Sequence, residues 1–115
     1  MRKLLVVTLV VLSALTLSAQ KTAVVSETMT VTGSVVQFAG ATVAAIDESP
    51  NSVCSGVLET AQVRFTYDGT TPTSTVGTPL EIQQAVVIEG LGNITNFKAI
   101  RTGGTSGVIY WTCSK

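Results

Sequence analysis

Apolar and polar residues alternate along most of the chain after its first twenty residues. In residues 63–67 the apolar side chains share one face and the polar side chains the other. This period of two is typical of a β-strand with one buried face. The strand is followed by Asp68-Gly69, a pair that tolerates the positive φ of a tight reversal. The stretch therefore predicts a strand, a turn and then a polar, threonine-rich connection that ends near residue 80.

Similar alternation predicts the other strands. In one of them Val86 and Ile88 face one way and Val87 and Glu89 the other, and in another Phe97 and Ala99 are the expected core pair. An extended arm or first strand is expected at residues 21–27. The predicted strands are residues 29–35, a strand pair around Gly40 within 36–46, a long strand at 54–67 with a bulge near 59–60, then 80–89, 94–101 and 108–113. The alanines of residues 41–45 leave a short helix open as the alternative.

Turn signals separate these segments. A charged loop with Pro50 occupies residues 47–52, and glycine-rich turns occupy residues 90–93 and 102–107. Short strands joined by glycine-rich turns are typical of an all-β protein. We therefore expect a small antiparallel β-sandwich, immunoglobulin-like or jelly-roll-like, formed by residues 20–115 as one domain.

The first residues have the pattern of a secretory signal. Arg2 and Lys3 precede an apolar run over residues 4–17, and small residues follow it, so cleavage is expected after Ala19. The run is shorter than the roughly 20 apolar residues that span a bilayer. Residues 1–19 are thus predicted to be a signal peptide, with a retained hydrophobic helix as the alternative. The protein is expected to be extracellular or part of a virion, and to touch a membrane only through residues 1–19 if they are kept.

Export changes the charge. Seven basic residues balance seven acidic ones in the whole chain, and loss of Arg2 and Lys3 leaves a net charge of about −2. A weakly acidic protein without a basic run is a poor nucleic-acid binder, so no nucleic-acid partner is expected.

The chain has two cysteines, Cys54 and Cys113. An even count in an exported protein favours a disulfide between them. Two separate buried thiols are the alternative if the protein matures in a reducing cytoplasm.

No residue set indicates catalysis or a cofactor. The chain has no histidine, the commonest general base and zinc ligand. Its carboxylates are scattered, so neither an enzyme activity nor a metal is predicted. Asp68 is expected to cap its own turn rather than to bind calcium. The Asn93-Ile94-Thr95 glycosylation pattern is interpreted as a chance match.

Two surfaces are candidates for binding. The polar turn is the candidate contact surface, through Asp68, Thr70, Thr71 and Thr73. Three aromatic residues are the candidate sugar-stacking platform, namely Tyr67, Tyr110 and Trp111. Tyr110 and Trp111 are adjacent and must point to opposite faces of one strand, so at most one of them can join such a platform.

The C-terminal half resembles small β-domain proteins encoded in the structural gene regions of tailed phages. The resemblance rests on residues 58–65, 68–77 and 94–107 and on the closing strand. It implies a non-enzymatic virion component that acts by protein–protein contacts, as a homo-oligomer or within a larger particle or filament. The signal segment and the two cysteines depart from that pattern and favour assembly outside the membrane.

Residues 67–73 followed by 97–100 are similar, more loosely, to immunoglobulin-like accessory modules of chitin- and hexosamine-degrading enzymes. This similarity implies the alternative of an exported glycan-binding module. A membrane-anchored surface protein is the further alternative if residues 1–19 are kept.

Overall fold

The computed structural model describes residues 22–47 and 49–115, so the predicted signal segment lies outside the described residues. The described part is mostly β-structure with two short helices. In chain order its elements are β1 (Ala23–Val31), α2 (Gly40–Ile46), β2 (Val53–Glu59), β3 (Val63–Thr66), β4 (Thr78–Leu80), β5 (Ala85–Glu89), α3 (Leu91–Asn96), β6 (Lys98–Arg101) and β7 (Gly107–Ser114).

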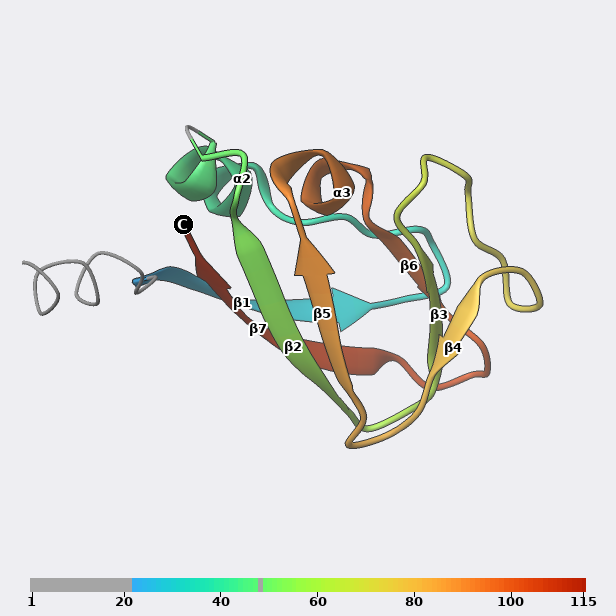
Figure 1. The fold of residues 1–115 in the computed structure, drawn as a ribbon. Coiled ribbons are helices and arrows are strands. Elements are labelled where there is room, and N and C mark those ends of the chain that lie inside the picture. Colours follow the sequence, from blue (N-terminus) through green and yellow to red (C-terminus); the bar gives the residue numbers. More distant parts are fainter. Residues whose placement is uncertain (1–21, 48) are drawn as a thin grey trace, which may run out of the picture.

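The strands form two antiparallel sheets. One has four strands in the order β1-β7-β2-β5, and the other has three in the order β4-β3-β6 (Figure 1). The segment after β1 joins them, because the Arg101 amide donates to the Thr32 carbonyl over 3.0 Å. Val36 and Ala99 exchange two further backbone hydrogen bonds of 2.9 and 3.0 Å. The prediction of antiparallel β-structure is therefore confirmed.

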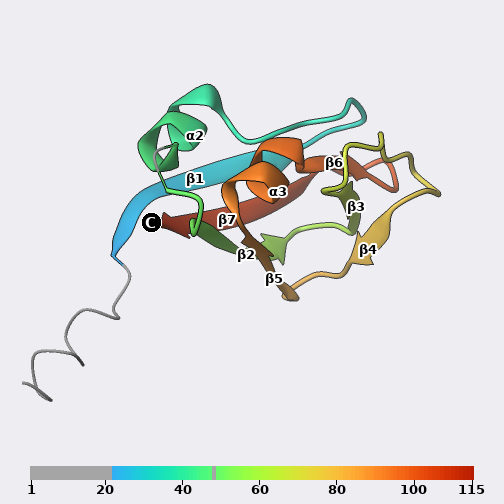
Figure 2. The ribbon, with the colours of Figure 1, turned by 45° about the horizontal axis from the view of Figure 1, so that its top comes forward.

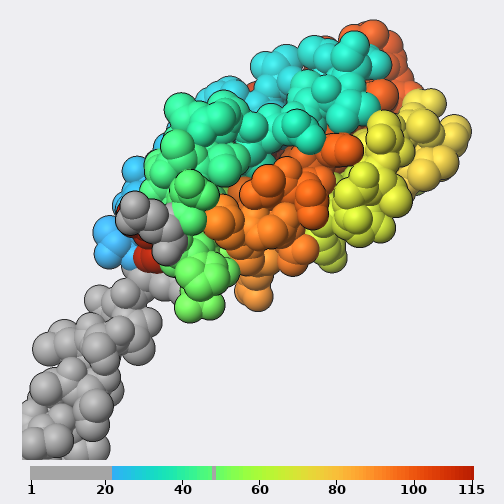
Figure 3. Space-filling model, turned by 90° about the horizontal axis from the view of Figure 1, so that it is seen from above, coloured from blue at the N-terminus to red at the C-terminus, as the bar shows by residue number. Residues whose placement is uncertain are grey.

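Both helices cover the same face of the four-stranded sheet. Figure 2 shows α2 above β1 and β7, with α3 next to it, and Figure 3 shows the two helices side by side from above. Ile46 of α2 and Ile94 of α3 are fully buried in the core beneath them. The opposite face of this sheet receives neither helix.

An aromatic cluster fills the core between the helices and the two sheets. The Phe97 ring lies 5.2 Å from Trp111, 5.2 Å from Phe38 and 5.7 Å from Phe65, measured between centroids. Phe97 and Ala99 are both fully buried, which confirms them as core residues of their segment. Val86 and Ile88 of β5 are also buried.

The strand pair predicted within residues 36–46 is wrong, because residues 40–46 form helix α2. Side chains outside the helix satisfy both of its ends. Glu27 Oε1 on β1 accepts hydrogen bonds from the Ala39 amide (3.0 Å) and the Thr42 hydroxyl (2.5 Å). At the other end, the buried Ser52 hydroxyl donates to the Ile46 carbonyl over 3.1 Å. These contacts let the alanine-rich segment adopt the helix that its propensity permits.

The long strand predicted at residues 54–67 is also wrong, because it is two strands in different sheets. The chain turns at Thr60, whose φ is 80°. The Thr60 hydroxyl donates to the Ser106 carbonyl over 2.8 Å, which holds the turn against the loop before β7. The bulge predicted near residues 59–60 is therefore a complete change of direction.

Three other boundaries differ from the predictions. The strand predicted at 80–89 is divided, because Leu80 ends β4 in the three-stranded sheet and β5 begins only at Ala85 in the four-stranded sheet. The arm at residues 21–27 and the strand at 29–35 are replaced by one strand, β1, which ends at Val31. The predicted turn at 90–93 and the first part of the strand at 94–101 form helix α3. This helix starts at Gly90, whose φ is 91°, and its Ile94 amide donates to the Gly90 carbonyl over 3.1 Å. Only Lys98–Arg101 of the predicted strand remains extended.

Candidate functional site

The face of the four-stranded sheet that the helices leave uncovered carries a block of uncharged residues. We call this block the open face. Cross-strand pairing arranges it in two rows, with Val57 next to Tyr110 in one row and Ser55 next to Thr112 in the other. All eight of its residues are exposed, and they are Ala85, Val57, Tyr110 and Thr28 in the first row, and Val87, Ser55, Thr112 and Ser26 in the second.

Three large apolar side chains lie on the open face. Val57, Val87 and Tyr110 are 42%, 55% and 49% exposed. Carboxylates occur only beyond the two rows, at Glu59 on one end of β2 and at Glu89 on the far end of β5. Sequence reasoning missed this surface, although β2 and β5 carry apolar residues on both faces, and that pattern is the signal that could have found it.

A second feature is the loop of residues 67–77 between β3 and β4. Side chains of β3 and β6 hold three of its backbone carbonyls. Arg64 Nη1 donates to Gly77 O over 2.7 Å, the Thr66 hydroxyl donates to Thr70 O over 2.6 Å, and Lys98 Nζ donates to Gly69 O over 3.4 Å. The charged groups of Arg64 and Lys98 therefore stabilise the loop itself.

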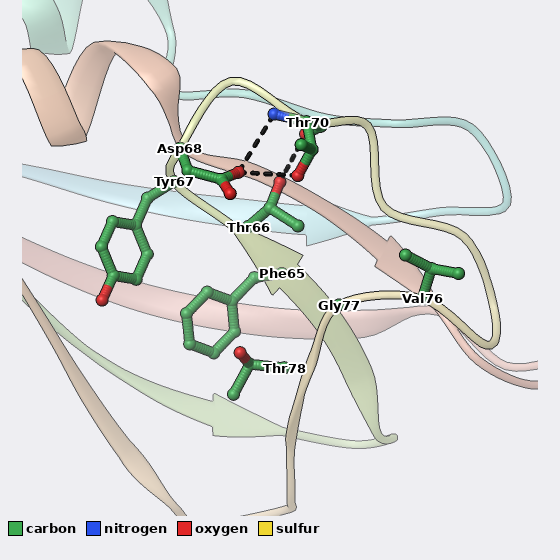
Figure 4. A pocket seen from close by; sticks show the side chains of 8 residues that line it. All are labelled: Phe65, Thr66, Tyr67, Asp68, Thr70, Val76, Gly77 and Thr78. Atoms are coloured by element: carbon green, nitrogen blue, oxygen red, sulfur yellow. Dashed lines mark hydrogen bonds between the residues drawn. The ribbon is translucent and has the colours of Figure 1, made fainter.

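Residues of this loop, of the end of β3 and of the start of β4 line an open pocket of about 430 Å³. Figure 4 shows the Phe65 and Tyr67 rings side by side below it, with the oxygen-bearing side chains of Asp68, Thr66 and Thr70 gathered above them. The two ring centroids are 6.3 Å apart with an interplanar angle of 19°. The pocket is completed by Val76, Gly77 and Thr78.

Asp68 caps its own turn, as predicted. Its Oδ1 accepts hydrogen bonds from the Thr70 hydroxyl (2.6 Å) and the Thr70 amide (3.1 Å). These bonds favour the charged form and hold the pKa of Asp68 below its usual range. Among the described residues, no three acidic or cysteine side chains are grouped as a metal site.

The four residues of the polar turn are all exposed, but they do not all line the pocket. Asp68 and Thr70 line the pocket, whereas Thr71 and Thr73 do not. The Thr73 hydroxyl oxygen instead accepts hydrogen bonds from the amides of Thr75 and Val76 at 3.3 and 3.0 Å, inside the loop. Only two of the four residues of the candidate contact surface are therefore brought together in a concave site.

The three-residue aromatic platform does not form. Trp111 is only 1% exposed and belongs to the core, because inward positions of β7 alternate with outward ones. Tyr110 lies on the open face, and Tyr67, directly after β3 of the other sheet, lines the pocket. The prediction that Tyr110 and Trp111 point to opposite faces is confirmed.

The structure contains the Cys54–Cys113 disulfide that the even cysteine count predicts. The two residues also face each other in the β2–β7 pairing, and both are fully buried. The bond therefore joins the two central strands of the four-stranded sheet.

Comparisons with known proteins do not assign the chain to a family. No family model, curated protein or solved structure matches it. Within the described residues, no helix is both long and apolar enough to cross a membrane.

Proposed function

We propose that the protein is a non-enzymatic structural component, a small exported β-sandwich that works by protein–protein contacts in a virion or another extracellular assembly. The open face is its proposed contact surface, and its first partner is a second copy of the chain. The observation that carries the proposal is the uncharged centre of that face, where eight exposed residues from four strands include no acidic or basic side chain.

The composition of the open face supports this use. Charged residues are depleted at the centres of protein interfaces, whereas tyrosine is enriched there. Tyr110 sits between Val57 and Thr28 in its row, so its ring lies among small and β-branched neighbours. Removing the exposed parts of Tyr110, Val57 and Val87 from water would stabilise a complex by the hydrophobic effect.

A second copy fits the charge pattern of this face. Two uncharged centres can oppose each other without a like-charge contact. The carboxylates of Glu59 and Glu89 lie at the ends of the exposed block, where salt screens their repulsion. We therefore expect self-association to strengthen as ionic strength rises from about 10 mM to about 150 mM.

The disulfide supports the exported setting, since such bonds form and persist in oxidising compartments. The resemblance to phage structural proteins supports the kind of assembly.

Sedimentation velocity of the purified protein over a range of concentrations tests the proposal. The wild type is expected to form dimers or larger species. Val87→Lys places a charge in the open face and is expected to shift the protein to monomer. Ile82→Lys is the matched control, because Ile82 is 53% exposed, close to the 55% of Val87, but lies in the turn between β4 and β5.

Circular dichroism checks that both variants keep the wild-type fold. A wild type that stays monomeric at every concentration and salt condition would refute self-association. Equal effects of Val87→Lys and Ile82→Lys would remove the open face as the contact surface.

A further inference from the structure

The pocket beside Tyr67 has features of a binding site that is separate from the open face. It is built from a well-anchored loop, because carbonyls at residues 69, 70 and 77 each accept a hydrogen bond from a side chain of β3 or β6. The side chain of Pro72 in the same loop is fully buried. A site held in this way loses little conformational freedom when a ligand binds.

One side of the pocket is a flat apolar surface. Tyr67 is 45% exposed, and its ring stacks on Phe65, which in turn stacks on Phe97 with centroids 5.7 Å apart. This row of rings runs from the surface to the aromatic core. It therefore fixes the exposed face of Tyr67 in place as a stacking surface.

The polar side of the pocket mainly accepts hydrogen bonds. The Thr70 hydroxyl already donates to Asp68 Oδ1, and the Thr66 hydroxyl already donates to Thr70 O, so both hydroxyl oxygens are left as acceptors. Asp68 Oδ2 has no hydrogen bond among the described residues. A ligand must therefore supply donors to these three oxygens.

The charge of the lining narrows the class of ligand. Asp68 is the one charged residue in the lining, and it is an anion. A phosphate, sulfate or uronic acid would face this carboxylate, because the nearby Arg64 and Lys98 cations are bound by the Gly77 and Gly69 carbonyls and do not line the pocket. The lining therefore favours neutral ligands over anionic ones. The remaining ligands combine a flat apolar face with several donor groups.

We propose that this pocket binds a neutral sugar ring. The C–H face of the ring would stack on Tyr67, and its hydroxyls would donate to Asp68, Thr66 and Thr70. The volume of about 430 Å³ lies within the range of small-molecule sites. A lone ammonium group fits less well. Its ion pair with the exposed Asp68 carboxylate would be weak, and it would leave the threonine oxygens without a donor.

Isothermal titration calorimetry of the full protein tests the proposal. The probes are maltotetraose, cellotetraose and tri-N-acetylchitotriose, with tetralysine as the cationic probe. At least one neutral oligosaccharide is expected to bind. Tyr67→Ala is expected to weaken that binding about tenfold, a change typical of losing one aromatic contact.

Tyr110→Ala is the matched control, since Tyr110 is exposed to a similar degree but lies on the open face. It is expected to keep the sugar affinity of the wild type. Asp68→Asn keeps an oxygen for the Thr70 bonds but replaces the free Oδ2 acceptor by an amide donor, so it is expected to weaken sugar binding. Because this change removes the charge, it would abolish binding of tetralysine.

Absence of binding to all three neutral probes overturns the proposal, as does binding of tetralysine alone. Sugar binding that Tyr67→Ala leaves unchanged also overturns it. These outcomes are independent of self-association, because the pocket and the open face share no residue.

Discussion

Tyr110 and Trp111 are consecutive residues of β7 that lie on opposite sides of the four-stranded sheet, one 49% and the other 1% exposed. Trp111 contacts Phe38 and Phe97 in the core, with ring centroids 4.7 and 5.2 Å away. Tyr110 belongs to the open face. The two aromatic residues therefore have different roles, which mutations can separate.

Trp111→Ala is expected to lower the free energy of unfolding by about 3–5 kcal/mol, because it leaves a cavity in the aromatic core. Tyr110→Thr keeps a residue that favours strands, and we expect it to change the free energy of unfolding by less than about 1 kcal/mol. Urea denaturation followed by circular dichroism measures both. Similar losses in the two variants would contradict the assignment of Trp111 to the core.

The disulfide is expected to contribute about 4 kcal/mol to the free energy of unfolding, since its cysteines are 59 residues apart. Replacing both Cys54 and Cys113 by alanine should remove that contribution in urea denaturation. Reducing agent should destabilise the wild type by a similar amount and leave the double variant unchanged. A double variant as stable as the wild type would show that the bond adds nothing to stability.

Glu27→Ala is expected to lower the free energy of unfolding by about 1–2 kcal/mol, because it leaves the Ala39 amide and the buried Thr42 hydroxyl without their acceptor. Hydrogen exchange should show the amides of α2 losing protection before those of β2. Glu59→Ala is the control, since Glu59 is exposed at the end of β2. If both variants give the same exchange pattern, Glu27 does not hold the helix.

Gly107→Ala is expected to destabilise the protein by about 1–3 kcal/mol through overpacking. A Cβ at this position would lie 2.6 Å from Val63 Cγ1 and 2.7 Å from the Ala61 carbonyl oxygen. Gly104→Ala is the control, because a Cβ there meets nothing within 4 Å. In thermal denaturation we expect a lower Tm for Gly107→Ala and an unchanged Tm for Gly104→Ala. An unchanged Tm for Gly107→Ala would contradict the close packing at the start of β7.

Thr70→Val is expected to raise the pKa of Asp68 toward its usual range, because the hydroxyl bond is the largest cause of its depression. A carboxyl whose pKa is lower in the folded state stabilises the protein above its unfolded pKa. That contribution is lost as the pH falls through the folded pKa, below about pH 4. NMR titration of the Asp68 carboxyl carbon measures the shift, and equal titration curves in the two proteins would contradict the assignment.

Local pattern predicted the parts of the fold that depend on neighbouring residues. Alternation predicted Phe97 and Ala99 as core residues and put Val86 and Ile88 on one face of their strand, and all four are buried. The preference of aspartate for turns predicted that Asp68 accepts a backbone N–H of its own turn, and the Thr70 amide donates to it. The even cysteine count, together with the expectation of export, predicted the Cys54–Cys113 bond. In each case the physical cause lies within a few residues or in the composition.

Tertiary contacts decided the rest. Residues 40–46 are helical because Glu27, on strand β1, and Ser52, in the loop after the helix, satisfy the two ends of the helix. Trp111 is in the core and Tyr110 on the open face because the helices cover one side of the sheet. The pocket exists because side chains of β3 and β6 hold the loop over Phe65 and Tyr67. Such partners come together only when the sheets pack, so no local pattern in the sequence could specify them.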